Sequence, residues 1–152
     1  LMVTEPIRYV EEFAAIGADI VTIHLEACED VETTLDAIRA CGKKAGLSIK
    51  PSTPVCEIKK YLSKVDMILL MTVEPGFGGQ SIIQESFDRI REARSIISES
   101  NYDIDLEVDG GINRENLKDI VEAGANVIVA GSAVFVGDIS DNVSGMLDVL
   151  NA

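Results

Sequence analysis

The stretch Asp66-Met67-Ile68-Leu69-Leu70-Met71-Thr72-Val73-Glu74-Pro75-Gly76-Phe77-Gly78-Gly79-Gln80-Ser81 joins a strongly apolar run to a glycine-rich loop. A short, continuous apolar run that ends at turn residues is typical of a strand buried on both faces. Parallel α/β proteins place their ligand-binding loops at the carboxyl ends of such strands. The stretch therefore predicts an α/β fold with a parallel sheet and a functional loop directly after this strand.

The same alternation of strand and helix recurs on both sides of this stretch. A helix that ends at glycine and leads into a buried strand occurs twice, as Ile16-Gly17-Ala18-Asp19-Ile20-Val21 and as Ala123-Gly124-Ala125-Asn126-Val127-Ile128. We expect five strands, at residues 19–24, 44–49, 66–71, 104–108 and 126–130. We expect helices at residues 4–16 (with Thr4 as N-cap), 31–40, 54–62, 84–98, 114–123, 132–135 and 139–150.

The number of strand–helix units, five, does not by itself decide between a closed barrel and an open sheet. They are too few for a closed eight-stranded barrel, and they fit an open doubly wound sheet. No low-complexity linker divides the chain, so we expect residues 1–152 to form a single domain. The opening Leu1-Met2-Val3 is apolar and is followed at once by a helix-start signal, which predicts the end of a strand already in progress.

The composition and net charge of the chain exclude several classes of function. The chain has 152 residues, of which 47% are hydrophobic and 26% charged, and its net charge is −13. This balance is typical of a packed domain and argues against nucleic-acid or anionic-membrane binding through a basic patch. No apolar run reaches the ~18–20 residues of a membrane span. The odd set Cys28, Cys41 and Cys56 lacks a C-x-x-C pair, so we expect reduced thiols and a cytoplasmic protein.

Three glycine clusters follow three of the expected strands. They contain Gly76, Gly78 and Gly79, then Gly110 and Gly111, and finally Gly131 with Ser132. Glycines at strand ends let several backbone N–H groups converge on one anion. The chain lacks the Gly-Lys-Ser/Thr of a P-loop and the G-x-G-x-x-G of a dinucleotide site, so the clusters predict a phosphate site outside the nucleotide-binding classes.

Several segments resemble motifs of the ribulose-phosphate 3-epimerase family, and they follow one another in the order and at the spacing found in that family. Pro75-Gly76-Phe77-Gly78-Gly79-Gln80 and Val108-Asp109-Gly110-Gly111-Ile112 carry most of the resemblance. The other matching segments are Leu1–Pro6, Thr22–Ala27 and Ala130–Phe135. The resemblance implies a (β/α)8 TIM barrel, of which this chain would supply about five carboxyl-terminal units.

The resemblance also implies residue roles. Asp109 would be an acid/base and a ligand of a divalent cation (Zn, Fe, Mn or Co), and Met2 and Met71 would line the substrate pocket. The resemblance also implies a set of residues that bind the substrate and its phosphate. They are Gly76, Phe77, Gly78, Gly79, Asp109, Gly110, Gly111, Gly131 and Ser132. The family's other metal ligands and second acid/base would precede Leu1. Bulky substitution at Gly111 or Gly131 is expected to abolish phosphate binding while the fold survives.

The implied reaction interconverts D-ribulose 5-phosphate and D-xylulose 5-phosphate, which belong to the pentose phosphate pathway. An allulose 6-phosphate 3-epimerase and a non-catalytic phosphate-binding fragment remain alternatives. We expect the full-length parent to be a homo-oligomer, and the 152 residues alone to self-associate and to lack turnover. His24, the only histidine, is expected to be structural or pocket-lining. The run Arg89–Glu92 is expected to be a solvated helix face, and Glu26 is expected to be solvated or to cap a helix.

Overall fold

The computed structural model describes residues 1–151, and their strands form one parallel sheet in sequential order. The order is β1-β2-β3-β4-β5, and every neighbouring pair is parallel. A doubly wound sheet reverses its strand order at a switch point, whereas a barrel wall does not. The order therefore confirms the predicted barrel-type fold. The strands are β1 (Ile20–His24), β2 (Lys44–Ile49), β3 (Met67–Met71), β4 (Asp105–Asp109) and β5 (Val127–Val129).

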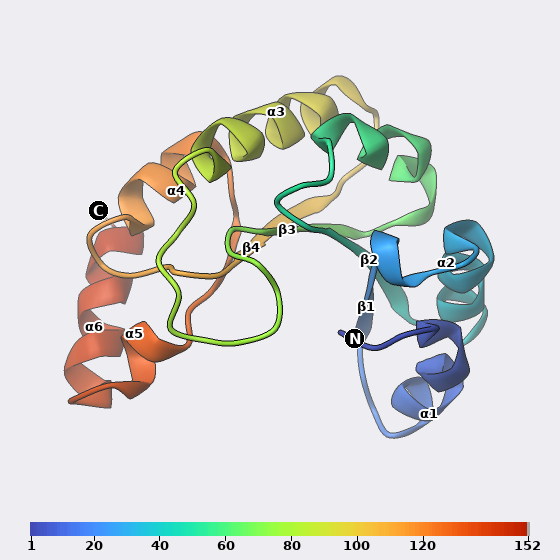
Figure 1. Cartoon of the computed structure of the whole chain (residues 1–152), viewed down its shortest axis with the longest axis horizontal. Helices are drawn as coiled ribbons and strands as arrows, with labels where there is room; N and C mark the ends of the chain where they lie inside the picture. The colour runs from blue at the N-terminus through green and yellow to red at the C-terminus, as the bar shows by residue number, and fades with distance from the viewer. Residues whose placement is uncertain (152) are drawn as a thin grey trace.

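The helices follow the outer, convex side of this sheet, from α1 and α2 at one end to α6 at the other (Figure 1). The α-helices are α1 (Val10–Ala15), α2 (Val31–Ala40), α3 (Ser86–Glu99), α4 (Leu117–Ala123), α5 (Ser132–Phe135) and α6 (Ile139–Leu150). Short 3₁₀ segments are η1 (Pro6–Tyr9), η2 (Leu25–Ala27), η3 (Val55–Lys60) and η4 (Leu62–Lys64). No helix of residues 1–151 combines the length and apolarity that crossing a bilayer requires.

The two faces of the sheet are chemically different. Side chains alternate along a strand, and on β4 Leu106 and Val108 are fully buried while Glu107 and Asp109 stay partly exposed. Leu106 and Val108 belong to one apolar cluster with side chains of the surrounding helices, such as Ile90 of α3. The hydrophobic core therefore lies between sheet and helices. The opposite, inner face is mixed, because the carboxylates of β4 lie beside the apolar Leu69 and Met71 of β3.

Two predicted helices differ from those observed. Thr4 is not an N-cap: Glu5 occupies that position with φ 51°, and its N–H donates to the Ala27 carbonyl at 3.2 Å, so the chain enters a 3₁₀ turn at Pro6. The apolar face expected for residues 4–16 is only partly buried, because Val10 and Ala14 are buried whereas Ile7, Tyr9 and Phe13 are about 40% exposed. The helix expected at 54–62 is instead η3 and η4. Its buried Val55 and Ile58 are three residues apart, the repeat of a 3₁₀ helix.

Truncation of a central core side chain tests this division of the sheet. Leu106 is 0% exposed on the helix side of β4, so Leu106→Ala is expected to lower the free energy of unfolding by about 2–5 kcal/mol. Val121→Ala is the control, because Val121 is 41% exposed, and it is expected to change that value by less than about 0.5 kcal/mol. Urea unfolding followed by circular dichroism measures both, and equal effects would contradict the assignment of the core.

Candidate functional site

A hollow of about 380 Å³ lies at the carboxyl ends of β3, β4 and β5. Asp109 ends β4, Met71 ends β3, and Gly131 follows β5 by one residue. Every residue that the sequence predicted for the site lines this one hollow. They are Met2, Met71, Gly76, Phe77, Gly78, Gly79, Asp109, Gly110, Gly111, Gly131 and Ser132.

Hydrogen bonds hold the loop between β3 and α3 against the end of β4. The Thr72 N–H donates to the Asp109 carbonyl at 2.9 Å, and the Thr72 hydroxyl donates to the Gly110 carbonyl at 2.5 Å. Within the loop, Gln80 Nε2 donates to the carbonyls of Glu74 and Phe77, at 2.7 and 2.9 Å. The loop is drawn in yellow-green on the inner side of the sheet in Figure 1. Its shape is therefore set by contacts with the neighbouring strand end and by its own glutamine.

Gly111 and Gly131 differ in the space around them, although both line the hollow. Gly111 has φ +68°, and a Cβ there would lie 2.3 Å from the backbone nitrogen of Ile82. At Gly131 no atom lies within 4 Å of such a Cβ, and φ is −101°. At Gly111 the structure argues against the expectation that the fold tolerates a bulky residue, because the loop backbone packs directly on it. Gly131 faces open space.

Asp109 lies on the inner face of β4, with Glu107 two residues before it. Burial raises the pKa of the Asp109 carboxyl above its ordinary value. The pKa of Glu107 is also raised, first by burial and then by the charge of Asp109. A carboxylate with a raised pKa is a better proton acceptor at neutral pH, and such groups gather at functional sites. The burial of Asp109 in the lining of the hollow is therefore compatible with an acid/base role.

The described residues do not assemble a site for a divalent cation. Within residues 1–151 there is no group of three or more His, Cys, Asp or Glu side chains placed to hold a metal. Of the carboxylates that line the hollow, Asp109 is half-buried and Glu74 is exposed on the loop. One or two carboxylates leave most of the coordination sphere of a divalent metal to water. Asp109 could therefore hold such a cation only together with further ligands.

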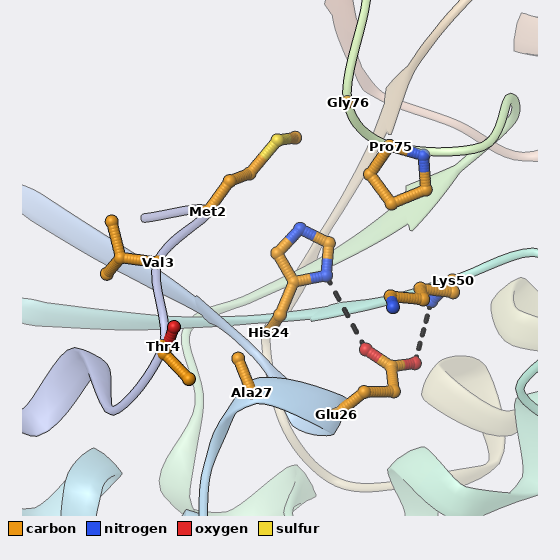
Figure 2. Close-up of a pocket in the computed structure, with 9 residues that line it drawn as sticks. All are labelled: Met2, Val3, Thr4, His24, Glu26, Ala27, Lys50, Pro75 and Gly76. Carbon is orange, nitrogen blue, oxygen red and sulfur yellow. Dashed lines mark hydrogen bonds and ion pairs between the residues drawn. The ribbon is translucent and has the colours of Figure 1, made fainter.

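A second cavity, of about 350 Å³, adjoins the hollow, and His24 lines it, in line with the prediction that His24 is structural or pocket-lining. The two share Met2, Pro75 and Gly76 in their linings. Figure 2 shows the second cavity between the start of the chain and the ends of β1 and β2, with His24 at its centre. The signal in the sequence was His24-Leu25-Glu26 at a strand end, a histidine and a carboxylate two positions apart.

Glu26 and Arg89 make specific contacts that the sequence did not predict. The Glu26 side chain is 21% exposed, and it accepts hydrogen bonds from the Lys50 N–H at 2.8 Å and from the Thr53 hydroxyl. Burial alone would raise the pKa of Glu26, but these hydrogen bonds outweigh it and lower the pKa. Arg89 of α3 donates from Nη2 to the Lys50 carbonyl at 3.0 Å, so it anchors the end of β2.

Comparison with known proteins gives a consistent picture. The model of the ribulose-phosphate 3 epimerase family matches residues 1–135. The ribulose-phosphate 3-epimerase of Escherichia coli (strain K12) is 51% identical over 135 residues, which are 89% of this chain and 60% of that protein. The same enzyme of Bacillus subtilis (strain 168) is 46% identical, over 89% of this chain and 63% of that protein. The chain thus spans about three fifths of the length of these relatives.

Solved structures with the same fold are more distant in sequence. The 3-hexulose-6-phosphate synthase of Salmonella typhimurium superposes with a TM-score of 0.69 at 19% identity, over 95% of this chain and 67% of that one. A mutant tryptophan synthase alpha-subunit of Pyrococcus furiosus gives 0.70 at 20% identity, over 93% and 60%. At these identities the likeness shows the fold alone.

The unequal surroundings of the two glycines are tested by alanine at each position. Gly111→Ala is expected to destabilise the chain by about 1–3 kcal/mol, because its methyl group meets the backbone at a positive φ. Gly131→Ala is expected to change stability by less than about 0.5 kcal/mol. Thermal melting of the two variants beside the parent measures the difference, and equal losses would contradict the packing of the loop on Gly111.

The raised pKa of Asp109 predicts a stability that depends on pH. Burial disfavours the ionised carboxylate in the folded chain, so the charge destabilises the fold above the raised pKa. Asp109→Asn is therefore expected to be more stable than the parent at pH 7. This gain is expected to shrink as the pH falls through the raised pKa and to vanish below the ordinary value of 3.8.

Urea unfolding at a series of pH values from 7 downwards measures this dependence. Asp103→Asn, at an exposed loop position, is the matched control and is expected to stay within about 0.5 kcal/mol of the parent. A loss of stability on Asp109→Asn at pH 7 would contradict the destabilising role of the charge.

Proposed function

The chain belongs to the ribulose-phosphate 3-epimerase family. We propose that the full-length protein to which it belongs catalyses the interconversion of D-ribulose 5-phosphate and D-xylulose 5-phosphate. The observation that carries the proposal is the convergence of three glycine clusters and Asp109 on one hollow. In such a substrate the enzyme has to hold the phosphate and the reacting carbon at a fixed separation. The glycine loops would bind the phosphate, and Asp109, at the end of a neighbouring strand, would face the reacting carbon.

The phosphate is proposed to bind at the glycine loops. Gly78 and Gly79 on the loop after β3, Gly111 after β4, and Gly131 with Ser132 after β5 line one side of the hollow. Glycine allows a backbone to approach an anion closely, and loops after the last strands of a barrel are a common phosphate site. Backbone N–H groups are therefore the proposed ligands of the phosphate oxygens.

Asp109 is proposed to move the proton at C3 of the ketose. The C2 ketone acidifies this proton, and removal on one face followed by return on the other inverts the carbon. A positioned carboxylate with a raised pKa accelerates such a transfer. Inversion needs an acid/base group on each face, and Asp109 is proposed to be one of the two. The divalent metal that the family resemblance implies is proposed to be held by Asp109 together with ligands outside the described residues, which are also proposed to supply the second acid/base.

We also propose that the protein is cytoplasmic and that its full-length form is a homo-oligomer. Cys28, Cys41 and Cys56 are free thiols, which suits reducing surroundings. Its net charge of −13 opposes binding to nucleic acid or to an anionic membrane. A small sugar phosphate is therefore the proposed partner of the site.

A chimera tests the proposed activity. Residues 1–135 of this chain are to replace the 135 aligned residues of the Escherichia coli relative, which supplies the remainder of the barrel. The chimera is expected to epimerise ribulose 5-phosphate, assayed beside allulose 6-phosphate. Asp109→Asn is expected to lower kcat by about 10²–10⁴-fold, because it removes a general acid/base. Gly131→Leu is expected to raise KM about tenfold or more, because its side chain fills the open space beside Ser132.

Asp103→Asn in the chimera controls for the loss of one carboxylate and is expected to keep the parent's kcat and KM. The unmodified chain of 152 residues, assayed alongside, is expected to show no turnover. An inactive chimera that folds and binds divalent metal would contradict the proposal. So would faster turnover of allulose 6-phosphate than of ribulose 5-phosphate.

A further inference from the structure

The cavity beside the site is centred on a buried histidine that the proposed mechanism does not use. His24 ends β1 and is 6% exposed. Its Nδ1 faces Glu26 Oε2 at 3.5 Å and has no closer hydrogen-bond partner among the described residues. In Figure 2 the other ring nitrogen, Nε2, points away from Glu26 into the cavity, toward the space between Met2 and Pro75. No hydrogen bond among the described residues uses Nε2, and the cavity offers this nitrogen room for a partner.

Glu26 fixes which ring nitrogen faces the cavity as an acceptor. Its carboxylate accepts hydrogen bonds at Oε1 from the Lys50 N–H and the Thr53 hydroxyl, and these bonds orient Oε2 toward the ring. A carboxylate beside Nδ1 favours the tautomer with the proton on Nδ1, which leaves Nε2 with a free lone pair. Burial lowers the pKa of His24, and this also favours the neutral ring. The pair therefore presents a preorganised hydrogen-bond acceptor to the cavity.

The position of this acceptor relative to the site determines what it can contact. Met2, Pro75 and Gly76 form the shared wall between the His24 cavity and the hollow of Asp109. Gly111, Gly131 and Ser132 line only the hollow, so the phosphate side is the far side from His24. A ligand anchored there by phosphate and extended past Asp109 would reach the His24 cavity with its other end. In an open-chain ketose phosphate that end carries hydroxyl groups, which are donors to an imidazole lone pair.

We propose that His24 is a substrate-positioning residue, whose Nε2 accepts a hydrogen bond from a hydroxyl of an open-chain ketose phosphate at the end remote from the phosphate. The inference rests on the proposed function, because it takes the same ligand and extends its site. Lys50 lines the same cavity and adds a positive charge near the hydroxyl end. The Glu26–His24 pair thus selects for a hydroxylated chain over an anion alone.

Nitrogen NMR on the unsubstituted chain tests this contact directly. Since His24 is the only histidine, ¹⁵N-histidine labelling gives one imidazole, with no problem of assignment. Without ligand, Nδ1 is expected to be protonated and Nε2 unprotonated. Ribulose 5-phosphate is expected to move the Nε2 resonance toward that of a protonated nitrogen, whereas inorganic phosphate is expected to leave it unchanged. Both probes are expected to move the backbone amides of Gly111 and Ser132.

Affinity measurements by calorimetry complete the test with the same two probes. His24→Phe keeps a planar ring without an acceptor, and it is expected to weaken binding of ribulose 5-phosphate about tenfold without changing that of phosphate. His24→Gln retains a polar group at a similar reach and is expected to lose less. Glu26→Gln is expected to weaken the sugar phosphate selectively. Glu29→Gln, the matched control at an exposed position outside the cavity, is expected to bind both probes like the parent.

The outcomes separate the inference from the function on which it rests. If the Gly111 and Ser132 amides respond to ribulose 5-phosphate while Nε2 and the His24→Phe affinity do not change, the inference alone is overturned. Equal weakening of both probes by His24→Phe would also overturn it, because that result marks a structural role. If ribulose 5-phosphate moves neither the glycine-loop amides nor Nε2, the proposed function fails and the inference fails with it.

Discussion

The parallel pairing of β3 with β4 is the constraint from which the site follows. It places Met71 opposite Asp109, and the ladder continues past the strand ends because the Thr72 N–H donates to the Asp109 carbonyl. The Thr72 hydroxyl then fixes the Gly110 carbonyl, so the glycine loop after β3 and the Gly-Gly turn after β4 cannot move apart independently. A slip of one residue in this register would turn Asp109 toward the helices and remove it from the hollow.

The division of the sheet into two faces separates stability from chemistry. Leu106 and Val108 pack against the helices and supply the apolar burial, so the alternate positions on β4 are free to carry carboxylates. Burial raises the pKa of Glu107 and of Asp109, so we expect their charges to oppose folding at neutral pH. Proteins commonly accept such local destabilisation where a group has to react. The core on the other face offsets it.

The sequence predicted most of the fold because the strands are short apolar runs with glycine after the preceding helices. The observed β2 and α2 match their expected bounds, and β3 differs by one residue. The entry into η1 was missed because Glu5 is tied to Ala27, a contact between segments distant in the sequence. The predicted site residues come together in one hollow, since the parallel order fixes where strand ends lie. The closeness of Gly111 to Ile82 and the Glu26–His24–Lys50 arrangement depend on packing, which spacing along the chain does not encode.

The acidity of the protein explains why the proposed phosphate site is built of backbone rather than of cations. Within residues 1–151, the hollow has no lysine or arginine in its lining, and Asp109 and Glu74 add negative charge. Charges on the outer helices act weakly across the molecule, because salt screens exposed charges beyond about 8–10 Å. Neutral N–H groups at glycine turns bind an anion locally without attracting anions in general. Lys50 lines the adjoining cavity, whereas Gly111 and Gly131 line only the hollow. The proposed ligand would therefore meet backbone dipoles at its phosphate end and a positive charge at its other end.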